Sequence, residues 1–377
     1  MEEYQDILFT SDYKKSSGAN KWTCTLILLS LALITRIILF FAAKNPSQVE
    51  SLYSASIYPY IAGLVGSISG IIPFSIAETF LILTPLLIII GLIAIIKKPS
   101  LFLNNINSIL HYIVRFLAVI YILFYFLWGF NYYRPDYSVI ANMDEASVTY
   151  TDLKKLTIFM IEKTNEKRDA LPEDENGLFF INESFKSLGA ISNKGFDDYK
   201  VGTFSLDRNF SRIKPVSLSK FMSYTGVMGI YIPFTSEPTI NVDIPPQNLL
   251  STISHEIAHQ KGFAKEEEAN FIAYKANINN PDERFQYSGY YLALTYLINE
   301  VYEESRQDYF LLYTELSDAV KRDMAFASDY WTSKEGRIED AVTTMNDNYL
   351  KANNQADGVK SYGGVVKLLL TEYKDQL

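Results

Sequence analysis

The sequence predicts a mostly α-helical membrane protein, with three N-terminal transmembrane helices followed by a water-soluble α+β domain. Two observations predict this division. The long apolar runs of the 377-residue chain fall almost entirely before Tyr133, and the remainder mixes apolar and charged residues at helical spacing. We therefore expect a membrane domain over residues 1–130 and a second domain over residues 131–377.

Three runs are long enough to cross a bilayer, for which a helix needs about 20 apolar residues. They cover residues 22–43, 77–96 and 108–130, and the third ends in FLWGFNYY, an aromatic sequence typical of a membrane interface. A further apolar stretch, residues 56–75, is rich in Gly and Ser and is bounded by Pro59 and Pro73. We interpret it as a re-entrant or interfacial segment. A crossing there would instead place the second domain in the cytoplasm.

The positions of the lysines predict the orientation. Three lysines precede the first run and a pair, Lys97 and Lys98, separates the second from the third, whereas Lys44 alone lies between the first and the second. Basic residues concentrate on the cytoplasmic side of a membrane. We therefore expect a cytoplasmic N-terminus, three crossings, and a second domain on the outer side of a multi-pass protein that contacts membrane lipid.

Composition excludes several classes of function. The net charge of −9 and the sequence pI of about 5.1 argue against nucleic-acid binding. Cys24 is the single cysteine, which excludes internal disulfides and cysteine metal clusters. Arg36, Glu78 and Arg115 lie in or beside the apolar runs. Either they pair with each other or reach the interface, or they carry a transport or sensor function.

The second domain has helical spacing over most of its length. It predicts helices over residues 151–168, 246–261, 265–279, 286–304, 308–325 and 334–351. Between the first two, residues 227–242 (VMGIYIPFTSEPTINV) are strand-forming but are interrupted by Pro233 and Pro238. Because proline cannot donate to a β-ladder, we expect a small sheet with this segment at its edge.

The stretch STISHEIAHQKGF, residues 251–263, carries two of the three histidines of the chain. Pro246 suits the start of a helix through this stretch. His255 and His259 then project together, one turn apart, so both imidazoles can reach a single metal ion. Glu256 lies beside them, where it can take the proton of a metal-bound water as a general base. The H-E-x-x-H pattern predicts a metal site; the alternative is an ordinary helix with two surface histidines.

A catalytic zinc site needs a third protein ligand and an open position. Gly262 can end the helix in a left-handed conformation and let the chain turn back, and no histidine follows it. The third ligand is therefore expected to be a carboxylate, from Glu266, Glu267 or Glu268. Imidazole and carboxylate ligands in this pattern favour one Zn²⁺ ion.

HEIAH followed by Glu266, Ala269 and Asn270 resembles the gluzincin pattern of zinc metallopeptidases, which implies a zincin-like fold for the second domain. By position, the resemblance makes Glu266 the third ligand. It makes Asn270 the residue that braces a ligand histidine, with asparagine in place of the gluzincin aspartate. Glu268 is the reserve ligand.

Most of the chain also resembles a bacterial multipass membrane family known only as domain of unknown function 3810. The matching stretches are YPYIAGLVGSISGIIPFS, GIYIPFTSEPTIN, HEIAHQKGFAKEEEANFIAY and YLKANNQADGVKSYGGVVKLL. This resemblance implies a location in the bacterial cell membrane and a zinc-peptidase-like second domain.

Together these features predict a membrane-anchored zinc metallopeptidase acting on a peptide or protein, with a non-catalytic zinc-binding scaffold as the alternative. In zincins an edge strand upstream of the metal helix pairs with extended substrate. Glu237 and Asn241 are therefore candidates for lining the cleft, unless they only shape an edge hairpin. Tyr362, in a polar loop near the C-terminus, is a candidate donor to an oxyanion.

Overall fold

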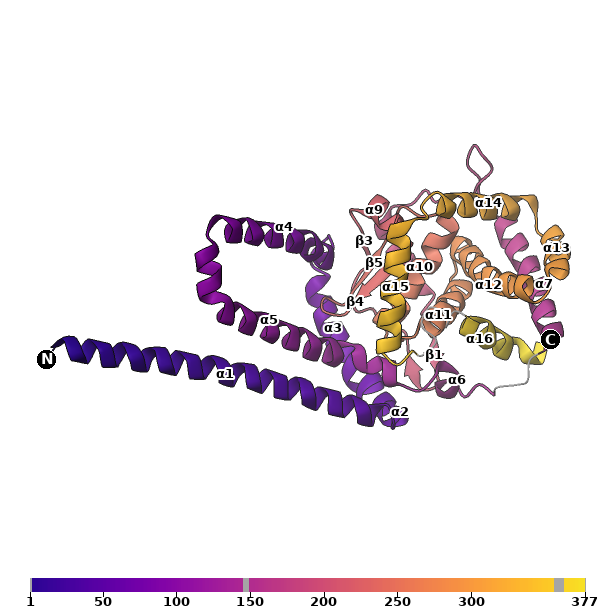
Figure 1. Ribbon diagram of the computed structural model, residues 1–377. Helices are drawn as coiled ribbons and strands as arrows, with labels where there is room; N and C mark the ends of the chain where they lie inside the picture. Colours follow the sequence, from indigo (N-terminus) through magenta and orange to yellow (C-terminus); the bar gives the residue numbers. More distant parts are fainter. Residues whose placement is uncertain (1, 145–148, 356–362, 377) are drawn as a thin grey trace.

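In the computed structural model, long apolar helices extend from one side of a mostly helical domain (Figure 1). The structure describes residues 2–144, 149–355 and 363–376. Within these residues, three helical segments are long and apolar enough to span a membrane: Trp22–Ala42, Ile76–Lys97 and Phe102–Leu127. The prediction of three such helices is confirmed, although the helix that carries the third begins earlier than expected.

The apolar segments lie in α1 (Glu2–Ala42), α4 (Ile76–Lys97) and α5 (Pro99–Leu127). α5 runs beside α1, where Arg115 and Thr25 are joined by a hydrogen bond of 2.9 Å from Nε to Oγ1. α4 and α5 are joined by a tight turn at Lys98. This turn and the N-terminus both lie at the end of the helices that is far from the domain (Figure 1).

Arg36, Glu78 and Arg115 each have a partner in the structure. Besides the contact of Arg115, the Glu78 carboxylate accepts hydrogen bonds of 2.9 Å from the amides of Ser217 and Leu218. Arg36 is hydrogen-bonded to Tyr133. In these contacts the partner of each charge is a neutral group and not another of the three charges.

The segment between α1 and α4 folds against the second domain. It forms α2 (Pro46–Val49), the π-helix η1 (Glu50–Ile57) and α3 (Tyr58–Ser69). The three follow one another without a gap, and the apolar part, α3, has 12 residues, fewer than the about 20 that a helix needs to cross a bilayer. Tyr58 donates its hydroxyl to the Gln260 carbonyl at 2.8 Å, which holds the segment at the membrane side of the domain.

The second domain packs around four helices: α7 (Tyr150–Asp169), α10 (Pro246–Gln260), α11 (Glu266–Asn279) and α12 (Glu283–Glu304). Their apolar faces form the main core, in which Leu156, Ile253 and Leu297 are fully buried. Smaller elements surround it: η2 (Gly129–Tyr133), α6 (Tyr137–Ile140), α8 (Phe185–Lys194), α9 (Ser219–Ser223), α13 (Arg306–Thr314), α14 (Asp318–Thr332), α15 (Arg337–Ala352), α16 (Gly363–Tyr373) and η4 (Lys374–Gln376).

One expected helix is divided. Residues 308–325 were expected to form a single helix, but α13 ends at Thr314 and α14 begins at Asp318. Ser317 is the cause, since its side chain accepts a hydrogen bond from the Val320 amide and so caps a new helix.

Two small sheets complete the fold. β1 (Lys200–Val201) pairs with β2 (Phe204–Ser205), and a three-stranded sheet has the order β3 (Lys214–Pro215), β5 (Glu237–Ile240), β4 (Gly229–Ile232). The prediction that proline keeps its strand at an edge is wrong for Pro238, because β5 is the central strand. Pro238 is tolerated there because the pairing with β3 begins only at Thr239.

Candidate metal centre

α10 carries the H-E-x-x-H sequence and begins at Pro246, as predicted. Leu250, Ile253 and Ile257 pack from one face into the core. His255 and His259 project from another face, with ring centroids 4.5 Å apart and ring planes nearly perpendicular. The helix therefore brings both imidazoles to one place.

The turn after α10 brings a carboxylate to these imidazoles. Gly262 has a φ of +92°, a conformation that favours glycine, and a Cβ there would lie 2.9 Å from the Tyr58 ring. Arg134 donates from Nη1 to the Gly262 carbonyl at 2.8 Å and so fixes the turn. The chain reverses, and α11 starts at Glu266 beside the end of α10.

His255, His259 and Glu266 form a group that could hold a metal ion, with one ligand atom of each within 4.8 Å of the others. The Nε2 atoms of His255 and His259 lie 3.3 Å and 3.7 Å from the two carboxylate oxygens of Glu266. Of the three carboxylates left open by the sequence, the structure places Glu266 in this group.

Hydrogen bonds on the far side of each ring orient the imidazoles. Nδ1 of His259 lies 2.7 Å from the Phe263 carbonyl, which can only accept, so this nitrogen carries the proton and Nε2 remains for a ligand. Nδ1 of His255 lies 2.9 Å from Oδ1 of Asn270. Such partners hold ligand histidines in place in metal sites. Asn270 thus lies where the sequence resemblance expects it.

The charges of the group are strongly coupled. Burial alone would raise the pKa of Glu266, but hydrogen bonds from the two imidazoles hold it far below its usual range. Burial alone would lower the pKa of His259, but the carboxylates of Glu266 and Glu256 raise it to about 9. A buried cluster of this kind favours the binding of a cation, since a carboxylate stays ionised in it.

Glu256 lies beside the group, and its side chain is buried between α10 and β4. Its Oε2 has no hydrogen-bond partner among the described residues, and the Tyr231 amide of β4 hydrogen-bonds the carboxylate. A Cβ on Gly229 would lie 2.6 Å from Oε1. Burial raises the pKa of Glu256, against the opposing effect of the two histidines. A buried carboxylate with an unused oxygen and a raised pKa suits a group that takes up and returns a proton.

Aromatic residues at the membrane end of the domain approach the centre, and sequence reasoning missed this role. Trp128 donates from Nε1 to the His259 carbonyl at 3.3 Å. Tyr132 donates its hydroxyl to that of Tyr349 at 3.0 Å. Burial raises the pKa of both hydroxyls, and the Glu266 carboxylate adds to the effect. FLWGFNYY indicates an interface anchor, and nothing in its spacing indicates a metal centre.

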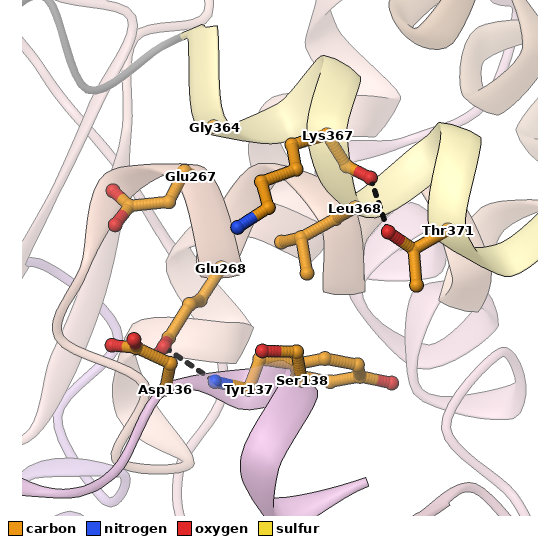
Figure 2. Close-up of a pocket in the computed structure, with 9 residues that line it drawn as sticks. All are labelled: Asp136, Tyr137, Ser138, Glu267, Glu268, Gly364, Lys367, Leu368 and Thr371. Carbon is orange, nitrogen blue, oxygen red and sulfur yellow. Dashed lines mark hydrogen bonds between the residues drawn. The ribbon is translucent and has the colours of Figure 1, made fainter. Parts of the chain in front are cut away.

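Glu268, the reserve ligand, faces a separate small pocket of about 140 Å³ (Figure 2). Its Oε1 accepts a hydrogen bond of 2.7 Å from the Tyr137 amide. Glu267, also on α11, lines the same pocket beside Gly364 of α16 (Figure 2). Neither carboxylate belongs to the group around His255 and His259.

The remaining candidates have other surroundings. Glu237 is fully buried, forms an ion pair with Lys214 at 3.0 Å, and accepts hydrogen bonds from the first amides of α4. Asn241 is also fully buried and donates to Ser223 Oγ and the Val227 carbonyl, at 3.1 Å each. These contacts support the sheet and its attachment to α4. Tyr362 lies outside the described residues.

Comparison with known families places the chain in one protein family. Residues 53–370 match the family described as "Protein of unknown function (DUF3810)". The match covers most of the chain, so the chain belongs to this family. No curated protein and no solved structure matches the chain.

Proposed function

We propose that this member of the DUF3810 family is a membrane-anchored zinc metallopeptidase. One observation carries the proposal: His255, His259 and Glu266 converge, and Glu256 lies beside them with an unpartnered carboxylate oxygen. Three convergent ligands and an adjacent buried carboxylate are the groups needed to activate a water against a carbonyl.

The donor set fits one Zn²⁺ ion. Zinc binds imidazole nitrogen and carboxylate oxygen, and catalytic sites use three protein ligands with one position left open. Nε2 of His255, Nε2 of His259 and a carboxylate oxygen of Glu266 would hold it, because both Nδ1 atoms face acceptors. When bound, the ion supplies a water of lowered pKa and polarises the scissile carbonyl.

The other residues have defined parts in the proposed hydrolysis. Glu256 accepts the proton of the attacking water at its free oxygen and passes it to the leaving amine. Asn270 and the Phe263 carbonyl keep the two imidazoles in the tautomer that leaves Nε2 free. The peptide bond is split by addition of this one water, and no other reactant is required.

We also propose the orientation in the bacterial cell membrane. The N-terminus and the Lys98 turn lie at the same end of the apolar helices (Figure 1), so the basic residues gather on one side. By the positive-inside rule this side is cytoplasmic, and residues 131–377 are extracytoplasmic. Residues 1–130 anchor the peptidase domain in lipid.

Metal analysis of the full-length protein in detergent tests the ligand set. We expect about one zinc per chain, lost in Glu266→Ala and kept in Glu268→Ala. The second variant is a matched control, since it removes the same side chain two positions further along α11, where the carboxylate faces Tyr137. Zinc retained in both variants would show that Glu266 is not a ligand.

A peptidase assay of Glu256→Gln tests the chemistry. The variant should keep its zinc and lose roughly 10²–10⁴-fold in rate, the usual contribution of a general base. Full activity in the variant would refute the assignment of Glu256. Stoichiometric zinc in a wild-type protein that hydrolyses no peptide would favour the non-catalytic scaffold instead.

A further inference from the structure

We infer that the substrate is a membrane-anchored polypeptide that is cut a few residues from the bilayer surface. This inference rests on the proposed peptidase function and names its substrate class. Three observations carry it: the end of α10 contacts the end of a membrane helix, β4 runs from Glu256 towards α4, and exposed apolar side chains lie beside the start of α4.

The C-terminal end of α10 packs against the residue that follows the third membrane span. The third apolar span runs to Leu127, and Trp128 follows it directly. Tryptophan is enriched at this level of a membrane protein, and Trp128 is buried there between the end of the span and the domain, with 4% of its surface exposed. Its indole contacts His259 both through the hydrogen bond to the carbonyl and through the ring, with centroids 6.0 Å apart. The candidate metal ligand is therefore one aromatic side chain away from the membrane surface.

β4 leads from the catalytic carboxylate to α4. Its first residue, Gly229, lies against Glu256. After β4 the hairpin returns to Glu237, whose carboxylate accepts hydrogen bonds of 3.3 Å and 3.2 Å from the amides of Ile76 and Ala77 in the first turn of α4. β4 thus lies along Glu256 from Gly229 to Tyr231, and its last residue, Ile232, pairs with Glu237 at the start of a membrane span.

The outer edge of β4 can receive a further strand. β4 is the last strand in the order β3-β5-β4, and such an edge binds extended peptide through main-chain hydrogen bonds. The Tyr231 amide hydrogen-bonds Glu256, so the catalytic carboxylate occupies one outward donor of this edge and lies directly beside an added strand. Ile230 is 46% exposed on β4 and offers apolar contact. A peptide on this edge therefore runs between the membrane surface and Glu256.

An apolar surface lies where this path meets the membrane. We call Leu218, Phe221 and Phe234 the membrane rim; they are 43%, 73% and 38% exposed. The Leu218 amide donates to the Glu78 carboxylate in the first turn of α4. This contact fixes the Leu218 part of the rim near the start of the membrane span. Exposed apolar patches mark interaction sites. A polypeptide with an extended segment next to a lipid-embedded anchor matches both the β4 edge and the membrane rim.

The test compares anchored with free peptides, using the full-length zinc-loaded protein in phosphatidylethanolamine–phosphatidylglycerol vesicles. The probe is a synthetic mixture of random-sequence peptides, made free and with a palmitoyl chain at either terminus. We expect an anchored form to be cleaved at least about tenfold faster, because anchoring raises its local concentration. Mass spectrometry should place the cuts within about four residues of the anchor, the length of β4.

A matched pair of variants tests the membrane rim. Phe221→Ser should lower the ratio of anchored to free cleavage several-fold. Phe310→Ser removes a phenylalanine that is 63% exposed on α13, away from the apolar helices (Figure 1), and should leave the ratio unchanged. An equal effect of both variants would overturn the role of the rim.

The outcomes separate this inference from the function on which it rests. Equal cleavage of free and anchored peptides, with cuts spread along their length, would overturn the inference and leave the peptidase function standing. If zinc-loaded protein cleaves neither form, the peptidase function fails, and this substrate class fails with it.

A second measurement does not depend on catalysis. In a Cys24→Ser background, Ile230→Cys carries a fluorophore, and headgroup-level doxyl lipids in the vesicles quench it if β4 lies at the surface. The same fluorophore on Phe310→Cys gives the reference for a position away from the membrane. Quenching at residue 230 should be several-fold stronger; quenching no stronger than at residue 310 would overturn the inference.

Discussion

Trp128 and His259 join the end of a membrane helix to the candidate metal centre. The indole nitrogen donates to the His259 carbonyl at 3.3 Å, and the two rings meet edge to face. This carbonyl lies in the last turn of α10 and also accepts a hydrogen bond of 2.9 Å from the Gly262 amide, so Trp128 adds a second donor to it. The membrane anchor therefore supports the metal helix directly.

Replacing Trp128 with Phe keeps a ring and removes the indole donor. The loss of one buried hydrogen bond should cost about 1 kcal/mol of unfolding free energy. We expect the unfolding temperature of the detergent-solubilised protein, followed by circular dichroism, to fall by about 2–4 °C. Trp331→Phe on α14 serves as the control and should change it little. If both variants unfold at the wild-type temperature, the contact does not support α10.

Asn270 holds His255 through Nδ1, at 2.9 Å from its Oδ1. Asn270→Ala should lower zinc affinity about 10–100-fold, the usual effect of losing such a partner. Asn270→Asp should retain most of the affinity, because a carboxylate also accepts from Nδ1. Competition with a chelator measures the zinc affinity of the wild type and of both Asn270 variants. The control is Asn279→Ala, which alters an exposed asparagine of the same helix. An Asn270→Ala protein with wild-type affinity would show that the brace is unimportant.

Zinc affinity should rise with pH up to about 9. Below this value the His259 imidazole is protonated, since its pKa is raised to about 9, and only the neutral ring binds metal. Zinc must displace one proton, so the apparent affinity should increase about tenfold per pH unit between roughly pH 7 and 9 and then level off. Calorimetry in buffers of different ionisation enthalpy counts the released proton. Binding at pH 7 without proton release would contradict this assignment.

The metal centre could be predicted largely because its determinants are local. Pro246 begins the helix, the histidines share one of its faces, and Gly262 returns the chain to Glu266, all within about two turns and a loop of the motif. The membrane helices could also be predicted from the sequence, because length and hydropathy define them.

The parts that could not be predicted depend on contacts distant in sequence. Trp128 and His259 are 131 positions apart, and no spacing rule relates them. Glu237 was a candidate either for lining a cleft or for shaping an edge hairpin, and a strand with prolines gives no indication that this side chain is buried against Lys214. The break between α13 and α14 depends on one serine cap, which apolar periodicity does not register.

Lys214 and Glu237 form an ion pair in which both side chains are fully buried, with Nζ and Oε1 3.0 Å apart. Lys214→Met leaves the Glu237 charge buried without its cation, so we expect a loss of about 3–5 kcal/mol in unfolding free energy. Adding Glu237→Gln removes that charge and should recover part of the loss. Lys163→Met, which breaks a partly exposed pair with Glu166, should cost less than about 1 kcal/mol. Denaturant unfolding in detergent, followed by circular dichroism, measures each protein. A Lys214→Met loss as small as that of Lys163→Met would show that the buried pair does not secure the sheet to α4.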